Sequence, residues 1–102
     1  MSLDFAVLGL DGAPEKTVSL DVDLHHEFVT TAADYGLARF RDFADYYEDA
    51  EVSVDDLPSF GDQVRVLYAQ TDSVVLRRFL DALMDLIDYA VAKGRSLHAI
   101  AD

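Results

Sequence analysis

Hydrophobic and polar residues alternate at the start of the chain, in two stretches that a turn signal separates. In residues 3–7 large apolar side chains occupy every second position, and residues 17–20 repeat the alternation. This period of two is typical of a strand with one buried face. Asp11-Gly12 followed by Pro14 favours a turn between the two stretches. The pattern therefore predicts an N-terminal β-hairpin whose loop spans about residues 9–15.

After the hairpin, apolar positions recur every three or four residues, which is the spacing of helices. Asp21 or Asp23 is a suitable N-cap for a first helix, and Gly36 lies where such a helix commonly ends. Residues 37–48 fit the face of a second helix, although an extended segment also fits them. We expect the helix.

Two further helices follow. Ser53 and Asp56 have the spacing of a capping box, and Pro58 falls in the first turn of the helix that they introduce. The fourth helix, capped by residues 71–73 and closed by Lys93 and Gly94, has the clearest pattern in the chain. Its continuous apolar stripe consists of Leu76, Phe79, Leu80, Leu83, Met84, Ile87, Ala90 and Val91.

The final residues predict a short strand, with Leu97 and Ala99 on one face and His98 and Ile100 on the other. A terminal strand needs a partner, and the apolar first strand is the best candidate. We therefore expect an α+β fold formed by one domain over residues 1–102. Its N-terminal β-hairpin and C-terminal strand form a small antiparallel or mixed sheet, with the first strand in the middle. About four helices pack on one face of that sheet.

The charge balance narrows the classes of function. Twenty acidic residues face eight basic ones, which gives a formal net charge of −12 on 102 residues. Such a surface repels nucleic acid and anionic membranes, because binding to both depends on clustered Lys and Arg. It attracts cationic proteins and speeds their encounter. We therefore expect a protein partner, with no nucleic acid and no membrane.

The chain has no cysteine, which excludes disulfides, thiolate metal sites and cysteine nucleophiles. The N-terminus has no basic segment, and its apolar run is too short for a signal sequence or a membrane span. We expect a cytoplasmic protein.

Acidic residues concentrate in DYYEDAEVSVDDL, residues 45–57, where six side chains are carboxylates and none is basic. Aligned on an EF-hand loop from Asp45, only Asp45 and Asp49 fall at ligand positions, and the required Gly and final Glu are missing. The segment is therefore not a calcium loop. It is either a helix face with capping acids or a docking surface in which Tyr46 and Tyr47 add contact area among carboxylates.

The remaining candidates for chemistry are weaker. Asp81, Asp85 and Asp88 lie opposite the apolar stripe of the fourth helix, which predicts a solvated face. His25 and His26 are adjacent and point about 100° apart on a helix, so they cannot easily share one metal ion. Whether His98 meets them in space is open, as is a Ser–His–Asp arrangement formed by folding. Without a supporting motif, we expect no catalytic residue, no cofactor and no metal.

The order of the pieces resembles small acidic immunity proteins of bacterial toxin systems. The resemblance rests on an LDFAVLGLDGAPEKTVSL hairpin, a helix opening LHHEF, a central DYYEDAEVSVDDLP and a terminal LHAIAD. It implies a non-enzymatic protein that neutralises a cognate, basic toxin domain by one-to-one docking. The residues expected to bind the partner are Asp45, Tyr46, Tyr47, Glu48, Asp49, Glu51, Asp55 and Asp56.

The alternative is a self-associating module with no toxin partner. Strand 2 or the C-terminal strand LHAIA would then pair with its twin at a sheet edge to form a homodimer.

Overall fold

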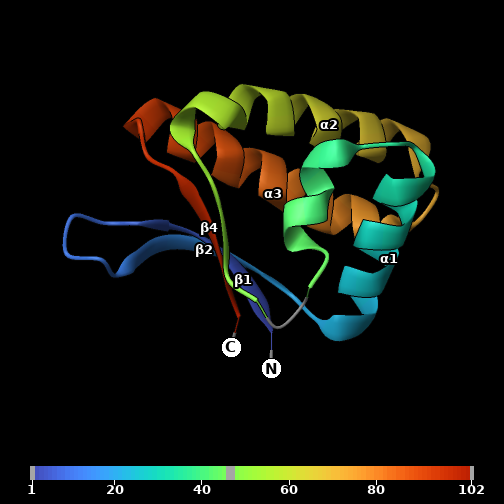
Figure 1. Ribbon diagram of the computed structural model, residues 1–102, viewed down its shortest axis with the longest axis horizontal. Helices are drawn as coiled ribbons and strands as arrows, with labels where there is room; N and C mark the ends of the chain where they lie inside the picture. Colours follow the sequence, from blue (N-terminus) through green and yellow to red (C-terminus); the bar gives the residue numbers. More distant parts are fainter. Residues whose placement is uncertain (1, 46–47, 102) are drawn as a thin grey trace.

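The predicted hairpin forms one half of a four-stranded antiparallel sheet in the computed structural model, which describes residues 2–45 and 48–101 (Figure 1). The strands are β1 (Leu3–Leu8), β2 (Pro14–Leu20), β3 (Ala50–Val52) and β4 (Leu97–Ala101), in the order β2-β1-β4-β3. In the hairpin turn Gly12 adopts a φ of 81°, and the Asp11 carboxylate accepts a hydrogen bond from the Ala13 N–H. Glycine suits this turn because a positive φ is costly for other residues.

Three α-helices and two 3₁₀-helices complete the described chain. They are α1 (Val22–Asp34), η1 (Ala38–Phe43), η2 (Val54–Asp56), α2 (Leu57–Gln70) and α3 (Val74–Lys93). The Asp21 carboxylate accepts from the Leu24 N–H as the N-cap of α1, and Ser73 caps α3 in the same way. Gly94 ends α3 with a φ of 64°. These caps confirm the predicted start of α1 and both predicted ends of α3. None of the described helices combines the length and apolarity that crossing a membrane requires.

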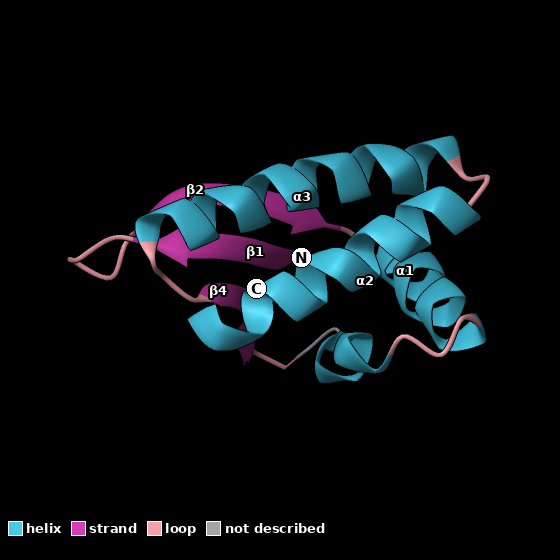
Figure 2. Ribbon diagram, turned by 90° about the horizontal axis from the view of Figure 1, so that it is seen from above, coloured by secondary structure: helices cyan, strands magenta, loops and turns pink. Residues whose placement is uncertain are grey.

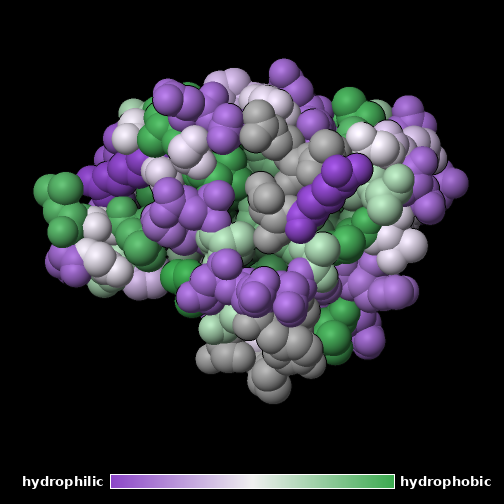
Figure 3. Space-filling view, in the orientation of Figure 1, coloured by the Kyte–Doolittle hydropathy of each residue, from purple (hydrophilic) through white to green (hydrophobic). Residues whose placement is uncertain are grey.

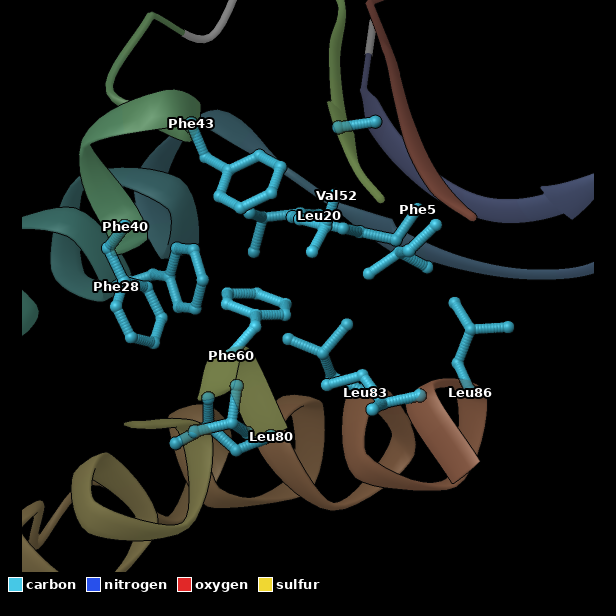
Figure 4. Close-up of a cluster of buried hydrophobic side chains, with 14 of the residues drawn as sticks. Phe5, Leu20, Phe28, Phe40, Phe43, Val52, Phe60, Leu80, Leu83 and Leu86 are labelled. Carbon is cyan, nitrogen blue, oxygen red and sulfur yellow. The ribbon is translucent and has the colours of Figure 1, made fainter. Parts of the chain in front are cut away.

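The helices cover one face of the sheet, as predicted, with α3 above β2 and β1 and α2 beside it (Figures 1 and 2). The register pairs Phe5 of β1 with Val18 of β2 and with Ala99 of β4, so these side chains share the covered face. Six phenylalanines are buried in this core, and Phe5 makes ring contacts with Phe28, Phe43 and Phe79. Figure 4 shows five of the six, Phe5, Phe28, Phe40, Phe43 and Phe60. The aromatic cluster joins the sheet to α1, η1 and α3.

The α+β class is confirmed, and three details of the prediction are corrected. Residues 37–48 were expected to form an α-helix, but the described part of this range, residues 37–45, does not, because Gly36 ends α1 with a φ of 67° and Leu37 is extended. The chain then turns as η1, where the three-residue spacing of Phe40 and Phe43 matches a 3₁₀-helix and directs both rings into the core. The prediction of about four helices is therefore roughly but not exactly right, since the described chain has three α-helices and two short 3₁₀-helices.

The second correction is β3, a strand inside the acidic segment that the sequence did not predict. It buries Val52 and exposes Glu51, and it pairs with β4. The third correction follows from it, because β4 lies between β1 and β3 rather than at an edge. The C-terminal strand LHAIA is therefore not available for pairing with a second copy. Strand β2 does lie at an edge.

Candidate binding surface

The acidic segment is exposed along the β3 side of the molecule. Asp45 follows the C-cap residue of η1, Glu48 and Asp49 precede β3, and all three carboxylates are exposed. Glu51 on β3 and Asp55 in η2 are exposed as well, while Asp56 is half-buried. Tyr46 and Tyr47 lie outside the described residues. Figure 3 shows this face of the molecule, where hydrophilic side chains cover most of the surface and hydrophobic ones form small separate areas.

Three of these acidic side chains also make contacts within the protein. The Asp49 Oδ1 accepts a hydrogen bond of 2.7 Å from the Ala101 N–H, which fastens the end of β4. The Ser53 hydroxyl donates to the Asp56 carboxylate at 3.2 Å, but neither side chain accepts a capping hydrogen bond from a backbone N–H, so the predicted capping box is not formed. The Glu51 Oε1 lies 3.4 Å from the His98 Nδ1. These contacts fix the segment against the sheet, so its carboxylates are presented from an ordered backbone.

Two adjoining hollows lie between α1 and the chain around η1, next to the start of the acidic segment. One has a volume of about 240 Å³ and is lined by Val29, Ala33, Gly36, Leu37, Phe40, Arg41 and Ala44. The other is wider and shallower and is lined by Val22, His25, His26, Val29, Thr30, Ala44 and Asp45. The walls of both hollows are largely apolar. Asp45 lines the wider hollow, whereas Arg41 lines the narrower one. The wider hollow therefore combines an apolar wall with a carboxylate, which suits a long cationic side chain, whose stem is apolar and whose head is charged.

The three histidines separate into different roles. His25 is buried, and its Nε2 lies 2.6 Å from the Phe43 carbonyl oxygen, so the ring donates to that carbonyl and ties α1 to η1. His26 is exposed on α1, and His98 lies on β4 opposite Ala6 and Glu51. Within residues 2–45 and 48–101, no three His, Asp or Glu side chains come together as a metal site would require. The structural role of His25 could not be predicted from the sequence, because the neighbouring residues do not show which of the two adjacent histidines is buried.

The predicted solvated face of α3 is confirmed, since Asp81, Asp85 and Asp88 are exposed. Asp88 lies 3.8 Å from Arg65 of α2, and both side chains are more than half exposed. An ion pair of this kind contributes little to stability. The surroundings do not provide the partial burial that catalytic carboxylates need.

A second polar cluster joins residues far apart in the sequence at the hairpin end of the molecule. The Tyr89 hydroxyl donates to the Glu15 Oε1 at 2.7 Å, and Arg95 lies 3.0 Å from the other carboxylate oxygen. The Tyr89 hydrogen bond, followed by Arg95, lowers the pKa of the Glu15 carboxyl. The same hydrogen bond raises the pKa of Tyr89, because an accepting carboxylate favours the protonated phenol.

Two lysines complete this cluster. Lys16 and Lys93 lie over the Tyr89 ring, at 5.3 Å and 5.6 Å from its centre. No sequence pattern predicts the cluster, because its members meet only when the hairpin folds back along α3. Its arrangement locks β2 to the end of α3 and collects basic side chains on one side of an acidic protein.

Comparison with known proteins adds no further guide to the role of these surfaces. The chain matches no protein-family model, no curated protein and no solved structure. The geometry and charge of the described residues are therefore the basis for the function proposed next.

Proposed function

We propose that this protein binds a cationic protein partner through the acidic surface formed by residues 45–56 and the adjoining hollows beside α1. The observation that carries the proposal is the placement of exposed carboxylates next to an apolar-walled hollow with Asp45 at its rim. Arginine or lysine side chains of a partner would lay their stems along Val22 and Val29 and direct their heads toward the carboxylates.

The long-range electrostatic field of the protein also favours binding at the acidic surface. Between Asp42 and Asp62 the chain has eight acidic residues and no Lys or Arg. Charge of one sign on one side steers an oppositely charged protein during diffusion, which raises the association rate at low salt. The partner should therefore bind faster at low ionic strength, and most of the lost affinity at high salt should come from a slower association rate.

The resemblance to immunity proteins suggests which cationic partner to test. We propose that it is a basic toxin domain, neutralised by one-to-one docking that covers its active cleft. The carboxylates would occupy positions that the toxin's anionic substrate otherwise takes, so binding and inhibition would share one surface. The protein acts as a binder in this proposal, and no chemical step is assigned to it.

The test is a capture experiment with matched charge variants. The purified protein is immobilised, lysate of its own species expressing the neighbouring toxin-like gene is passed over it at low salt, and bound protein is eluted with rising salt. The docking variant carries Asp45→Asn, Glu48→Gln and Asp55→Asn, which leaves the structural contacts of Asp49 and Asp56 intact. The control variant carries Asp11→Asn, Asp72→Asn and Asp88→Asn, an equal charge change at exposed positions elsewhere.

The proposal expects a basic polypeptide that is retained one-to-one by the natural protein and by the control variant but not by the docking variant. Equal retention of the polypeptide by both variants would show that net charge alone attracts it, and would refute the assignment of the acidic surface as the binding site. If the natural protein retains no basic polypeptide, the proposed binding function is refuted.

A further inference from the structure

Strand β2 is an open edge of the sheet on the side of the molecule away from the acidic segment. In the order β2-β1-β4-β3, the described chain provides a partner for β2 on one side only. Its side chains from Pro14 to Thr17 and at Ser19 are exposed. Alternate N–H and C=O groups of an edge strand point outward and can pair with another strand. Pro14 and Lys16 protect the first half of the edge, which leaves residues 17–20 as the part best suited to pairing.

The charge around this edge differs from that of the whole molecule. Tyr89 of α3 contacts Glu15 of β2, so the side of α3 that carries Tyr89 faces β2. Residues three, four, seven or eight positions from Tyr89 in the helix lie on the same side. The exposed or half-exposed charges gathered there are the cations Lys16, Lys93 and Arg95 and the carboxylates Glu15, Asp81 and Asp85, and Arg78 lies about one turn further along the helix. In a chain with a net charge of −12, the charges beside the β2 edge are therefore close to balanced.

We infer that the β2 edge binds a second copy of this chain, in an antiparallel β2–β2 pair around a two-fold axis near Val18. The result is a continuous eight-stranded sheet with the helices of both copies on one face. A two-fold axis makes the strand pairing self-complementary, since each copy offers the same edge. It also brings the two α3 helices side by side and antiparallel. Ala82 lies on the facing side, where its small side chain allows close approach.

The distribution of charge favours a second copy at this edge and disfavours one at the other. Association through the three-residue β3 would bring two acidic segments together, with eight carboxylates in residues 42–62 of each copy. Association through β2 places these segments at opposite ends of the dimer. Arg78 and Asp85 flank Ala82 on either side along α3, so an antiparallel pair of helices directs each Arg78 toward the Asp85 of the other copy.

Sedimentation velocity of the full chain over a range of concentrations tests the inference. A dimer is expected, and its dissociation constant should fall as NaCl rises because salt screens the repulsion between two acidic molecules. Thr17→Asp should weaken it by about tenfold or more, since symmetry places the new carboxylate in the contact twice. Thr30→Asp, the same change on an exposed face of α1, should leave the dimer unchanged.

A second measurement does not depend on the stability of Thr17→Asp. Because the chain has no cysteine, a single Thr17→Cys can be cross-linked only between copies. A two-fold axis near Val18 places the two copies of residue 17 diagonally across the strand pair, about 7–8 Å apart, which is too far for a direct disulfide but within reach of a short bis-maleimide. That reagent should cross-link Thr17→Cys efficiently and should not cross-link Thr30→Cys. A monomer at all concentrations, or a dimer that survives Thr17→Asp and fails to cross-link at position 17, would overturn the inference. Neither result bears on cationic partner binding, which uses the opposite side and weakens with salt.

Discussion

Replacing Phe43 by alanine tests whether η1 is a packed part of the fold. The ring is 1% exposed and lies 5.1 Å from the Phe5 ring and 5.3 Å from the Phe60 ring, centre to centre. Truncating a buried phenylalanine removes its transfer free energy and leaves a cavity, which costs about 3–5 kcal/mol. For a domain of this size each kcal/mol lowers Tm by at least about 4 °C, so Phe43→Ala should lower Tm by at least about 12 °C.

The assay is urea denaturation followed by circular dichroism at fixed ionic strength, with the free energy of unfolding extrapolated to water. Leu10→Ala is the matched control, because Leu10 at the hairpin tip is 97% exposed and its truncation should change stability by less than about 0.5 kcal/mol. A loss below about 1 kcal/mol for Phe43→Ala would refute the packing of η1. Residues 37–48 would then behave as a loosely attached connection, and His25 would have no fixed carbonyl to contact.

Three further outcomes are expected. His25→Ala should lower the free energy of unfolding by about 1–3 kcal/mol, because the buried Phe43 carbonyl loses its donor, while His26→Ala on the exposed side of α1 should have little effect in the same denaturation assay. Raising NaCl from 10 mM to 1 M should raise Tm in a calorimetric scan, because the Debye length falls from about 30 Å to about 3 Å and screens the self-repulsion of a molecule with a net charge of −12. Tyr89→Phe should raise the pKa of Glu15 toward its ordinary value in an NMR titration, since it removes the larger cause of the lowering. Because the folded-state pKa of Glu15 is lowered, its contribution to stability is present above the unfolded value and is lost as pH falls through the folded value, so acid unfolding should be less steep in Tyr89→Phe.

The sequence predicted the elements that local rules determine. Strict alternation identified β1 and β2, and the long apolar stripe together with Ser73 and Gly94 identified α3 at both ends. The error at residues 37–48 has a physical cause. Phe40 and Phe43 are three residues apart, a spacing that an α-helix and a 3₁₀-helix share, and the choice between them depends on core contacts that lie far away in the sequence.

Strand β3 was missed for a related reason. Three residues carry too little alternation to stand out, and Glu51 and its acidic neighbours indicate surface rather than strand. Pairing with β4 supplies the stabilisation that propensity does not, because the Ala50 and Val52 side chains meet Ala99 and Leu97 on the covered face. The acidic composition of the segment could be predicted, but its attachment along a sheet edge could not.

The two edges of the sheet differ in charge, and this links the two proposals. The acidic segment lies along β3, while the charges beside β2 are close to balanced, with Lys16, Lys93 and Arg95 against Glu15, Asp81 and Asp85. A cationic partner bound at the β3 side neutralises part of the charge that makes two copies repel each other. By linkage, partner binding should then tighten the dimer, and the dimer should bind the partner more tightly by the same factor. The coupling should vanish at high salt, where the repulsion that transmits it is already screened. If the coupling persists at 1 M NaCl, it is not electrostatic, and a structural change transmitted through β1 and β4 would be needed to explain it.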